Sequence, residues 1–163
     1  MANLAGGIMG KNAGFQNASV SSEGIRLAIV VCEWNPQITK RMEEAAKKEA
    51  EKAGCKISIS RVPGCYDSAF AANQLLMRED VDAAVVLGAV IKGETRHDEA
   101  IYNATALTLQ SISLARRKPI GLGIIGPGAT QKIASKRAQD YAKRAVWAAI
   151  ALHQRYRKNA PSP

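Results

Sequence analysis

The alternation of apolar and polar stretches along the chain predicts a repeating series of strands and helices. Two continuous apolar runs, "IRLAIVV" (25–31) and "AAVVLGAVI" (83–91), are typical of strands that are covered on both faces. The segment "KISISRV" (56–62) alternates apolar and polar positions, and "PIGLGII" (119–125) adds a further apolar run. The pattern therefore predicts four strands.

Between these strands the apolar residues recur at helical spacing. Gly54 provides a stop signal for the first helix, and Asp67 or Ser68 is the candidate N-cap of the second. The predicted helices cover residues 37–53, residues 67–79, a long segment from about Thr95 to Arg116, and the basic C-terminal region. Alternating strands and helices predict an α/β fold, with a parallel sheet, right-handed crossovers and helices on both faces.

Three segments that combine polar, aromatic and glycine residues each follow a predicted strand. They are "CEWNPQIT", "VPGCYDSA" and "VIKGETRHD". In a parallel sheet, ligands bind beyond the carboxyl ends of the strands. We therefore expect one crevice to contain all three segments.

The chain is long enough for one ordinary domain, and no change in composition divides it into two. Residues 1–24 are rich in Gly, Asn, Ser and Ala, and they predict a flexible N-terminal arm. Residues 25–158 form the predicted single α/β domain, and residues 159–163 form a C-terminal tail.

Composition narrows the cellular setting. No apolar run approaches the roughly 20 residues of a membrane span, and the N-terminus lacks the pattern of a signal peptide, so a cytoplasmic location is expected. The three cysteines have neither CxxC nor Cys/His ligand spacing. Free buried thiols are the expectation, rather than disulfides or a zinc site.

The net charge of +9 favours an anionic partner, which includes nucleic acid, a membrane surface or a phosphorylated metabolite. Binding of nucleic acid favours aromatic residues interleaved with the basic ones, or a recognisable module, and the sequence has neither. Small-molecule substrates are therefore the expected partners, with no role for nucleic acid or membrane.

His97 is the first candidate for chemistry. It lies near the first turn of its predicted helix, where the helix dipole disfavours the imidazolium, and a neutral imidazole exchanges protons near pH 7. The alternative is a surface or capping histidine. Gly93, Glu94 and Thr95 precede it and offer backbone amides and a hydroxyl at a helix N-terminus, which is a natural anion site.

Other candidates each have two interpretations. Trp34 either stacks on a flat heterocycle or seals the edge of the sheet. Arg137 either clamps a phosphate or is solvated, and Asp67, next to Cys65 and Tyr66, either accepts polyol hydroxyls or caps a helix. Together the candidates suggest a site that joins an aromatic amine to a phosphorylated carbonyl compound.

Four segments carry a family resemblance. "CEWNPQIT", "VPGCYDSA", "LGAVIKGETRHD" and "LGIIGPGAT", the last followed by "KRA", resemble in order and spacing the signature segments of the lumazine synthase family, particularly its archaeal branch. The resemblance covers roughly Ile25 to His153. It implies a three-layer flavodoxin-like fold with a four-stranded parallel sheet flanked by helices. It also implies a homopentamer, in some relatives part of a 60-subunit shell, with sites at subunit interfaces.

The activity implied by this resemblance is a transferase reaction of riboflavin biosynthesis. It condenses 5-amino-6-(D-ribitylamino)uracil with 3,4-dihydroxy-2-butanone 4-phosphate, giving 6,7-dimethyl-8-ribityllumazine, phosphate and water, without a metal or organic cofactor. His97 takes the place of the proton-transfer residue. The places that bind the pyrimidine and the ribityl chain fall to Trp34, Cys65, Tyr66, Asp67, Ala89, Val90, Ile91 and Leu122, and those that bind phosphate fall to Glu94, Thr95 and Arg137.

Three positions depart from the family pattern. Cys65 stands where alanine is usual and adds bulk near the ribityl place, and Ser68–Ala69 replaces an apolar residue followed by proline. Asp98 follows the histidine where bacterial relatives have Phe or Tyr, and a carboxylate there would favour the charged imidazole. Two alternatives remain open: an archaeal-type riboflavin synthase, and a shell-forming relative without catalysis.

Overall fold

The computed structural model describes residues 22–157, so the predicted arm lies almost wholly, and the predicted tail wholly, outside the described residues. Strands and helices alternate along this part of the chain: β1 (Arg26–Cys32), α1 (Pro36–Lys52), β2 (Lys56–Val62), α2 (Ser68–Leu76), β3 (Ala83–Ile91), α3 (His97–Arg116), β4 (Ile120–Ala129) and α4 (Gln131–Arg157). Every predicted strand and helix is present. Two bounds differ noticeably from the prediction, because α2 ends earlier than expected and β4 continues to Ala129.

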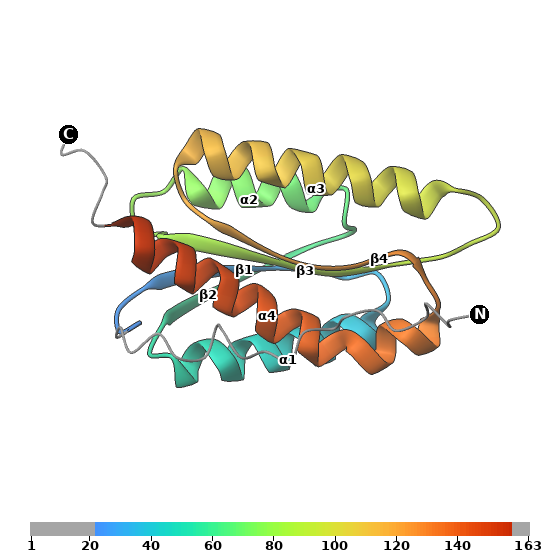
Figure 1. Cartoon of the computed structure of the whole chain (residues 1–163), viewed down its shortest axis with the longest axis horizontal. Helices are drawn as coiled ribbons and strands as arrows, with labels where there is room; N and C mark the ends of the chain where they lie inside the picture. Colours follow the sequence, from blue (N-terminus) through green and yellow to red (C-terminus); the bar gives the residue numbers. More distant parts are fainter. Residues whose placement is uncertain (1–21, 158–163) are drawn as a thin grey trace, which may run out of the picture.

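Within the described residues the strands form one parallel sheet in the order β2-β1-β3-β4. Helices α2 and α3 lie on one face of this sheet, and α1 and α4 lie on the other (Figure 1). This is the strand order of flavodoxin-like folds. The predicted three-layer α/β architecture is confirmed.

The two central strands explain the continuous apolar runs. On β1, Leu27 and Ile29 belong to the core beneath α1 and α4, whereas Val30 belongs to the core beneath α2 and α3. On β3, Val85 and Val86 divide between the two cores in the same way. Because successive side chains of a strand point to opposite faces, a strand covered on both faces needs apolar residues at every position.

Helix α4 packs closely on β4 because both elements present small residues. The buried face of α4 is lined by Ala134, Ala138, Ala142, Ala145 and Ala149. On the strand, a Cβ atom at Gly121 would overlap the backbone carbonyl of Ala145, lying 2.7 Å from its carbon. A Cβ at Gly123 would lie 3.2 Å from the Ala145 Cβ and 2.9 Å from the carbonyl oxygen of Val86. The two glycines therefore set the distance between α4 and the sheet.

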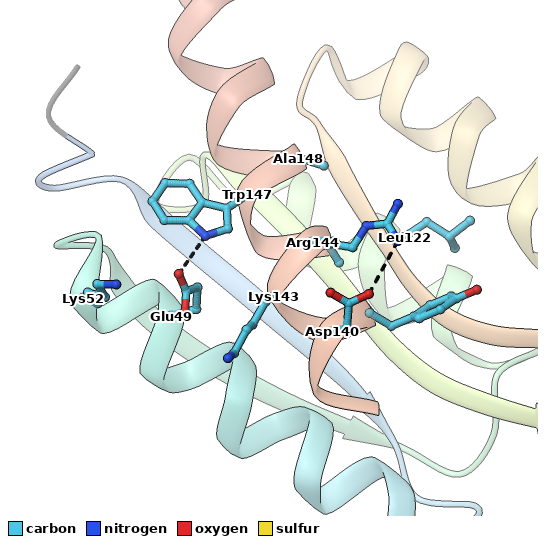
Figure 2. Close-up of a pocket in the computed structure, with 10 residues that line it drawn as sticks. Glu49, Lys52, Leu122, Asp140, Lys143, Arg144, Trp147 and Ala148 are labelled. Atoms are coloured by element: carbon cyan, nitrogen blue, oxygen red, sulfur yellow. Dashed lines mark hydrogen bonds and ion pairs between the residues drawn. The ribbon is translucent and has the colours of Figure 1, made fainter. Parts of the chain in front are cut away.

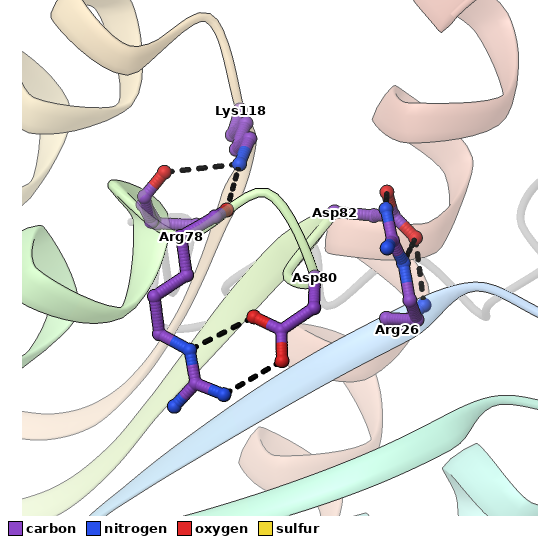
Figure 3. Close-up of polar contacts among 6 residues, drawn as sticks. Arg26, Arg78, Asp80, Asp82 and Lys118 are labelled. Atoms are coloured by element: carbon purple, nitrogen blue, oxygen red, sulfur yellow. Dashed lines mark hydrogen bonds and ion pairs between the residues drawn. The ribbon is translucent and has the colours of Figure 1, made fainter.

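The amino ends of β1 and β3 are held together by one ion pair. The Arg26 guanidinium donates to both carboxylate oxygens of Asp82, at 2.9 Å from Nε and 2.6 Å from Nη2, and the Arg26 amide donates to the same carboxylate at 2.9 Å (Figure 3). These hydrogen bonds lower the pKa of Asp82 to about 2. Nearby, Arg78 and Asp80 form an exposed ion pair within one loop.

The cysteines are free thiols, as expected, but they are not all buried. Cys32 and Cys65 are buried, whereas Cys55 is half-buried, so this part of the expectation was wrong: Cys55 comes just before β2, which is an edge strand. Partial burial raises the pKa of the Cys55 thiol to about 11. No helix within residues 22–157 combines the length and apolar character that crossing a bilayer requires.

The contact between α4 and β4 gives a first prediction. Replacing Gly121 with Ala should lower the free energy of unfolding by about 2–3 kcal/mol or more, because the new methyl group overlaps backbone that cannot move aside. Urea denaturation at fixed protein concentration measures this change. Gly93→Ala is the matched control, since a Cβ there meets nothing within 4 Å. Equal stability of the two variants would show that α4 can shift on the sheet.

The ion pair gives a second prediction. Because the folded pKa of Asp82 lies below its ordinary value of about 4, its stabilisation is complete above about pH 4 and is lost as the pH falls through about 2. Asp82→Asn should lower the thermal midpoint by roughly 2–4 °C at pH 7, and this difference should shrink towards pH 2. Asp80→Asn is the control and should change the midpoint less. A difference that does not depend on pH would contradict the assignment.

Candidate active site

The site is built on a part of β3 that extends past its neighbour. The parallel pairing of β1 with β3 ends at Val31 opposite Leu87, but β3 continues to Ile91. Among residues 22–157, no strand lies beside this extension on the edge that faces β1. The loops that follow β1 and β2 fill the place, and all four strands end at this edge of the sheet, on the right in Figure 1.

The loop after β1 is fastened to the extension by Asn35. This residue adopts a left-handed backbone conformation (φ 59°), and its side-chain amide donates to the carbonyl of Ala89 at 3.0 Å. Asparagine tolerates this conformation better than most residues, and Pro36 then begins α1. The adjacent amide of Trp34 donates to Pro63 at 3.1 Å, which joins this loop to the one after β2.

Trp34 projects into solvent at this junction. Its exposed fraction is 72%, and its Cδ1 lies 3.4 Å from the position that a Cβ of Gly64 would take. The ring borders a shallow cavity of about 290 Å³ lined by Glu33, Trp34, Asn35, Pro36 and Pro63. One face of an aromatic ring is thus available at the mouth of a crevice, and the indole does not seal the sheet.

The loop after β2 is a compact turn built around Cys65. The Gly64 amide donates to Asp67 Oδ2 at 2.9 Å, and the Ser68 hydroxyl donates to the Cys65 carbonyl at 2.6 Å. Asp67 occupies the N-cap position of α2, but its side chain makes no capping hydrogen bond. The capping interpretation of its carboxylate is therefore wrong: the carboxylate closes the turn, and both Asp67 and Tyr66 are exposed.

The sulfur atoms of Cys32 and Cys65 meet above Gly88. A Cβ at Gly88 would lie 2.5 Å from Cys65 Sγ and 2.9 Å from Cys32 Sγ, so only glycine leaves room for the pair. The Cys32 thiol donates a hydrogen bond to Cys65, which lowers the pKa of Cys65. A hydrogen bond from the Ala89 amide lowers it further, whereas burial raises it. The same hydrogen bond, together with burial, raises the pKa of Cys32.

The segment after β3 is exposed at the same edge of the sheet. The Lys92 amide donates to the Ala129 carbonyl at 2.9 Å, and from Gly93 to His97 every residue is exposed. His97 is the first residue of α3, which confirms its predicted place at the start of a helix. Glu94 and Thr95 lie just before it, as expected for residues near a helix N-terminus.

Two predicted site residues, Leu122 and Arg137, lie away from the crevice in the folded chain. Leu122 pairs with Val86, five residues before Ile91 and so about 16 Å back along the sheet. It is 40% exposed and lines a separate hollow of about 570 Å³ along α4, with Glu49, Tyr141, Arg144 and Trp147 among the other lining residues (Figure 2). Arg137 lies on an exposed position of α4. The single chain does not bring Leu122 to the strand ends.

This hollow is larger than the crevice, but it lacks the chemistry that the sequence indicates. The Trp147 ring nitrogen donates to Glu49 Oε1 at 2.7 Å, and Asp140 pairs with Arg144, so two of its carboxylates already have partners (Figure 2). None of the three segments that follow β1, β2 and β3 lines it. The crevice at the strand ends remains the better candidate for the active site.

The edge at which the strands end carries an exposed indole, a carboxylate, backbone groups of β3 and an exposed imidazole. These groups can stack on a heterocycle, accept hydroxyl hydrogen bonds and move a proton. Among residues 22–157 no three His, Cys, Asp or Glu side chains are placed to hold a metal ion.

Sequence reasoning missed two residues that build this site. Asn35 was overlooked, although an Asn-Pro pair after a strand is a recognised signal for a turn. Gly88 was read only as part of an apolar run, although an isolated glycine in a strand often marks a close approach of other atoms.

Comparison with known proteins agrees with this geometry. The family model described as 6,7-dimethyl-8-ribityllumazine synthase matches residues 24–157. A protein of that name from Metallosphaera sedula is 43% identical over 139 residues, which cover 85% of this chain and 92% of the relative. Its namesake from Aeropyrum pernix is 47% identical over 133 residues, covering 80% and 90%, and that from Staphylothermus marinus is 47% identical over 131 residues, covering 80% and 87%. The match to the family model and the identity to these relatives both show that the chain belongs to the 6,7-dimethyl-8-ribityllumazine synthase family.

Proposed function

We propose that this protein condenses 5-amino-6-(D-ribitylamino)uracil with 3,4-dihydroxy-2-butanone 4-phosphate, releasing 6,7-dimethyl-8-ribityllumazine, phosphate and water. The observation that carries the proposal is that the connections after β1, β2 and β3, which bear Trp34, Asp67 and His97, all lie at the edge of the sheet where the parallel strands end. Family membership gives the reaction, and the geometry of the crevice gives each residue its role.

The pyrimidine binds between the exposed Trp34 ring and the end of β3. Stacking on indole suits a flat, electron-rich heterocycle. Ala89 already uses its carbonyl to hold Asn35. Residues two apart in a strand direct their backbone groups to the same side, so the amide and carbonyl of Ile91 face the crevice as well. They supply hydrogen bonds to the polar edge of the ring, while Val90 lines the wall.

The ribityl chain lies along the turn after β2. Asp67 accepts the Gly64 amide through Oδ2, and its other oxygen is placed to accept hydrogen bonds from polyol hydroxyls. The exposed backbone around Tyr66 adds further polar groups. Cys65 is held back from solvent by its contact with Cys32 over Gly88, which supports a ribityl site that its sulfur does not crowd.

The phosphate of the second substrate binds near the start of α3. Glu94 and Thr95 present backbone amides and a hydroxyl at a helix N-terminus, where an anion is favoured. His97 moves protons during imine formation and during the β-elimination of phosphate, two steps that both need proton transfer. Holding both substrates in one crevice removes part of the encounter entropy, which makes positioning a large share of the catalysis.

Leu122 and Arg137 join the site from a neighbouring subunit. Leu122 is exposed on the edge strand beside the hollow along α4, and α2 and α3 present further exposed apolar residues, Phe70, Leu107 and Leu114. We infer that neighbouring subunits cover these side chains, because exposed apolar residues that gather into a patch are typical of interfaces between proteins. A homopentamer, alone or as part of a 60-subunit shell, is the assembly we propose, and the cytoplasmic location stays a prediction.

A direct assay tests the proposed reaction. Purified protein is incubated with both substrates, and the lumazine chromophore and free phosphate are followed together. Product should form only when both substrates are present. If it does not form, addition of the lumazine itself distinguishes a riboflavin synthase, which consumes it, from an inactive shell-forming relative.

The role of the imidazole gives a third prediction. His97→Ala should lower kcat by about 10- to 100-fold, because proton transfer is lost while stacking and substrate positioning remain. Steady-state kinetics measures the change, and Lys48→Ala, an exposed change on α1, is the control. Full turnover by His97→Ala would refute proton transfer by this residue.

The shared site gives a fourth prediction. His97→Ala and Arg137→Ala should each be slow alone, but co-expression in equal amounts should restore about a quarter of wild-type activity, because about one interface in four then pairs an intact His97 with an intact Arg137 of its neighbour. If one subunit supplied both residues, mixing would restore nothing. Activity of the mixed oligomers against each pure variant gives the answer.

A further inference from the structure

Asp98 is a buried carboxylate directly after the exposed His97. Its exposed fraction is 5%, and within residues 22–157 it is the only charged side chain among the buried residues. A carboxylate loses hydration when it is buried, and hydrogen bonds or favourable dipoles must replace that hydration. The position of Asp98 in the first turn of α3 supplies one such dipole.

The carboxylate also ties α3 to the end of β4. Asp98 Oδ2 accepts the Gly128 amide at 2.9 Å, a contact between residues that are 30 positions apart. Gly128 has φ +77°, a conformation that favours glycine. The same end of β4 lies against β3 and α3, since a Cβ at Gly126 would approach the Val90 carbonyl oxygen to 2.8 Å and the Tyr102 ring to 3.7 Å. The end of β3, the start of α3 and the end of β4 form one packed unit.

Asp98 begins the inward stripe of α3. Tyr102, Thr105 and Leu109 follow it at helical spacing, Thr105 and Leu109 are buried, and the Thr105 hydroxyl donates to the Cys65 carbonyl at 3.4 Å. Consecutive residues of a helix point about 100° apart around its axis. With Asp98 held inside, His97 is directed away from the sheet and into the exposed segment at the strand ends.

We propose that Asp98 is a positioning residue for His97. Its hydrogen bond to Gly128 fixes the rotation of the first turn of α3, and that rotation sets the direction of the imidazole. The inference rests on the proposed function, because it assigns to Asp98 a share of the proton transfer that His97 performs. Asp98 itself contacts neither substrate.

Two substitutions at Asp98 separate the hydrogen bond from the charge. Asp98→Ala removes the acceptor and should lower kcat about tenfold, with the KM for the ribitylaminouracil unchanged within about twofold, because Trp34 and Asp67 are untouched. Asp98→Asn keeps an acceptor oxygen of the same size and should stay within about threefold of the wild-type kcat. Glu99→Gln is the control. It removes a negative charge from the same turn of α3, but the only contact that it breaks is an exposed ion pair with Arg96.

A double variant tests whether Asp98 acts through His97. In the His97→Ala background, adding Asp98→Ala should lower kcat by less than about a further twofold, because the imidazole that Asp98 positions is already absent. Amide hydrogen exchange gives a readout that is independent of turnover. Asp98→Ala should speed the exchange of peptides that contain Gly128 and the first turn of α3, whereas Asp98→Asn and Glu99→Gln should leave these rates unchanged.

Each outcome either supports or overturns the inference. A wild-type kcat in Asp98→Ala overturns it, and so does an Asp98→Asn enzyme as slow as Asp98→Ala. A full tenfold loss that persists in the His97→Ala background shows a general structural role and overturns it too. If the wild-type protein itself forms no product from the two substrates, the proposed function fails, and the positioning of His97 for that reaction fails with it.

Discussion

The site depends on the unequal lengths of two neighbouring parallel strands. Strand β3 continues past the end of its pairing with β1, so the backbone groups at the end of β3 face a loop region instead of another strand. Buried backbone amides and carbonyls need partners, and here the loops after β1 and β2 provide them through Asn35 and Cys65. Satisfying this one edge brings the loops of Trp34 and Asp67 to the strand that leads to His97.

Much of this architecture follows from the sequence. The apolar runs of β1 and β3 predict central strands because both faces of a central strand are covered, and the alternation with helices predicts a parallel sheet. Parallel strands share one carboxyl edge, so the three informative segments were expected at one edge of the sheet, and they lie there. That a single crevice contains all three stays a prediction. The glycines and proline of residues 126–128 indicate a turn, yet β4 includes them, because pairing with β3 continues to Ala129.

The details that were not predictable depend on tertiary contacts. The direction of Asp98 depends on where α3 begins, and a shift of two residues in that start turns every side chain about 200° around the axis. Sequence reasoning paired Asp98 with its neighbour His97, but the folded chain pairs it with Gly128. The position of Leu122 opposite Val86 is a matter of register, which hydrophobic patterning does not specify for a strand that is apolar throughout.

The course of α4 separates the chemistry from the ends of the domain. Strand β4 runs towards the carboxyl edge, and α4 returns across the sheet, so α4 ends at the opposite edge, near the place where β1 begins (Figure 1). The polypeptide therefore enters β1 and leaves α4 on the side of the domain that faces away from the crevice. A segment that evolution or a protein engineer adds before β1 or after α4 starts far from the mouth of the site. It therefore does not change the loops that determine the geometry of the site.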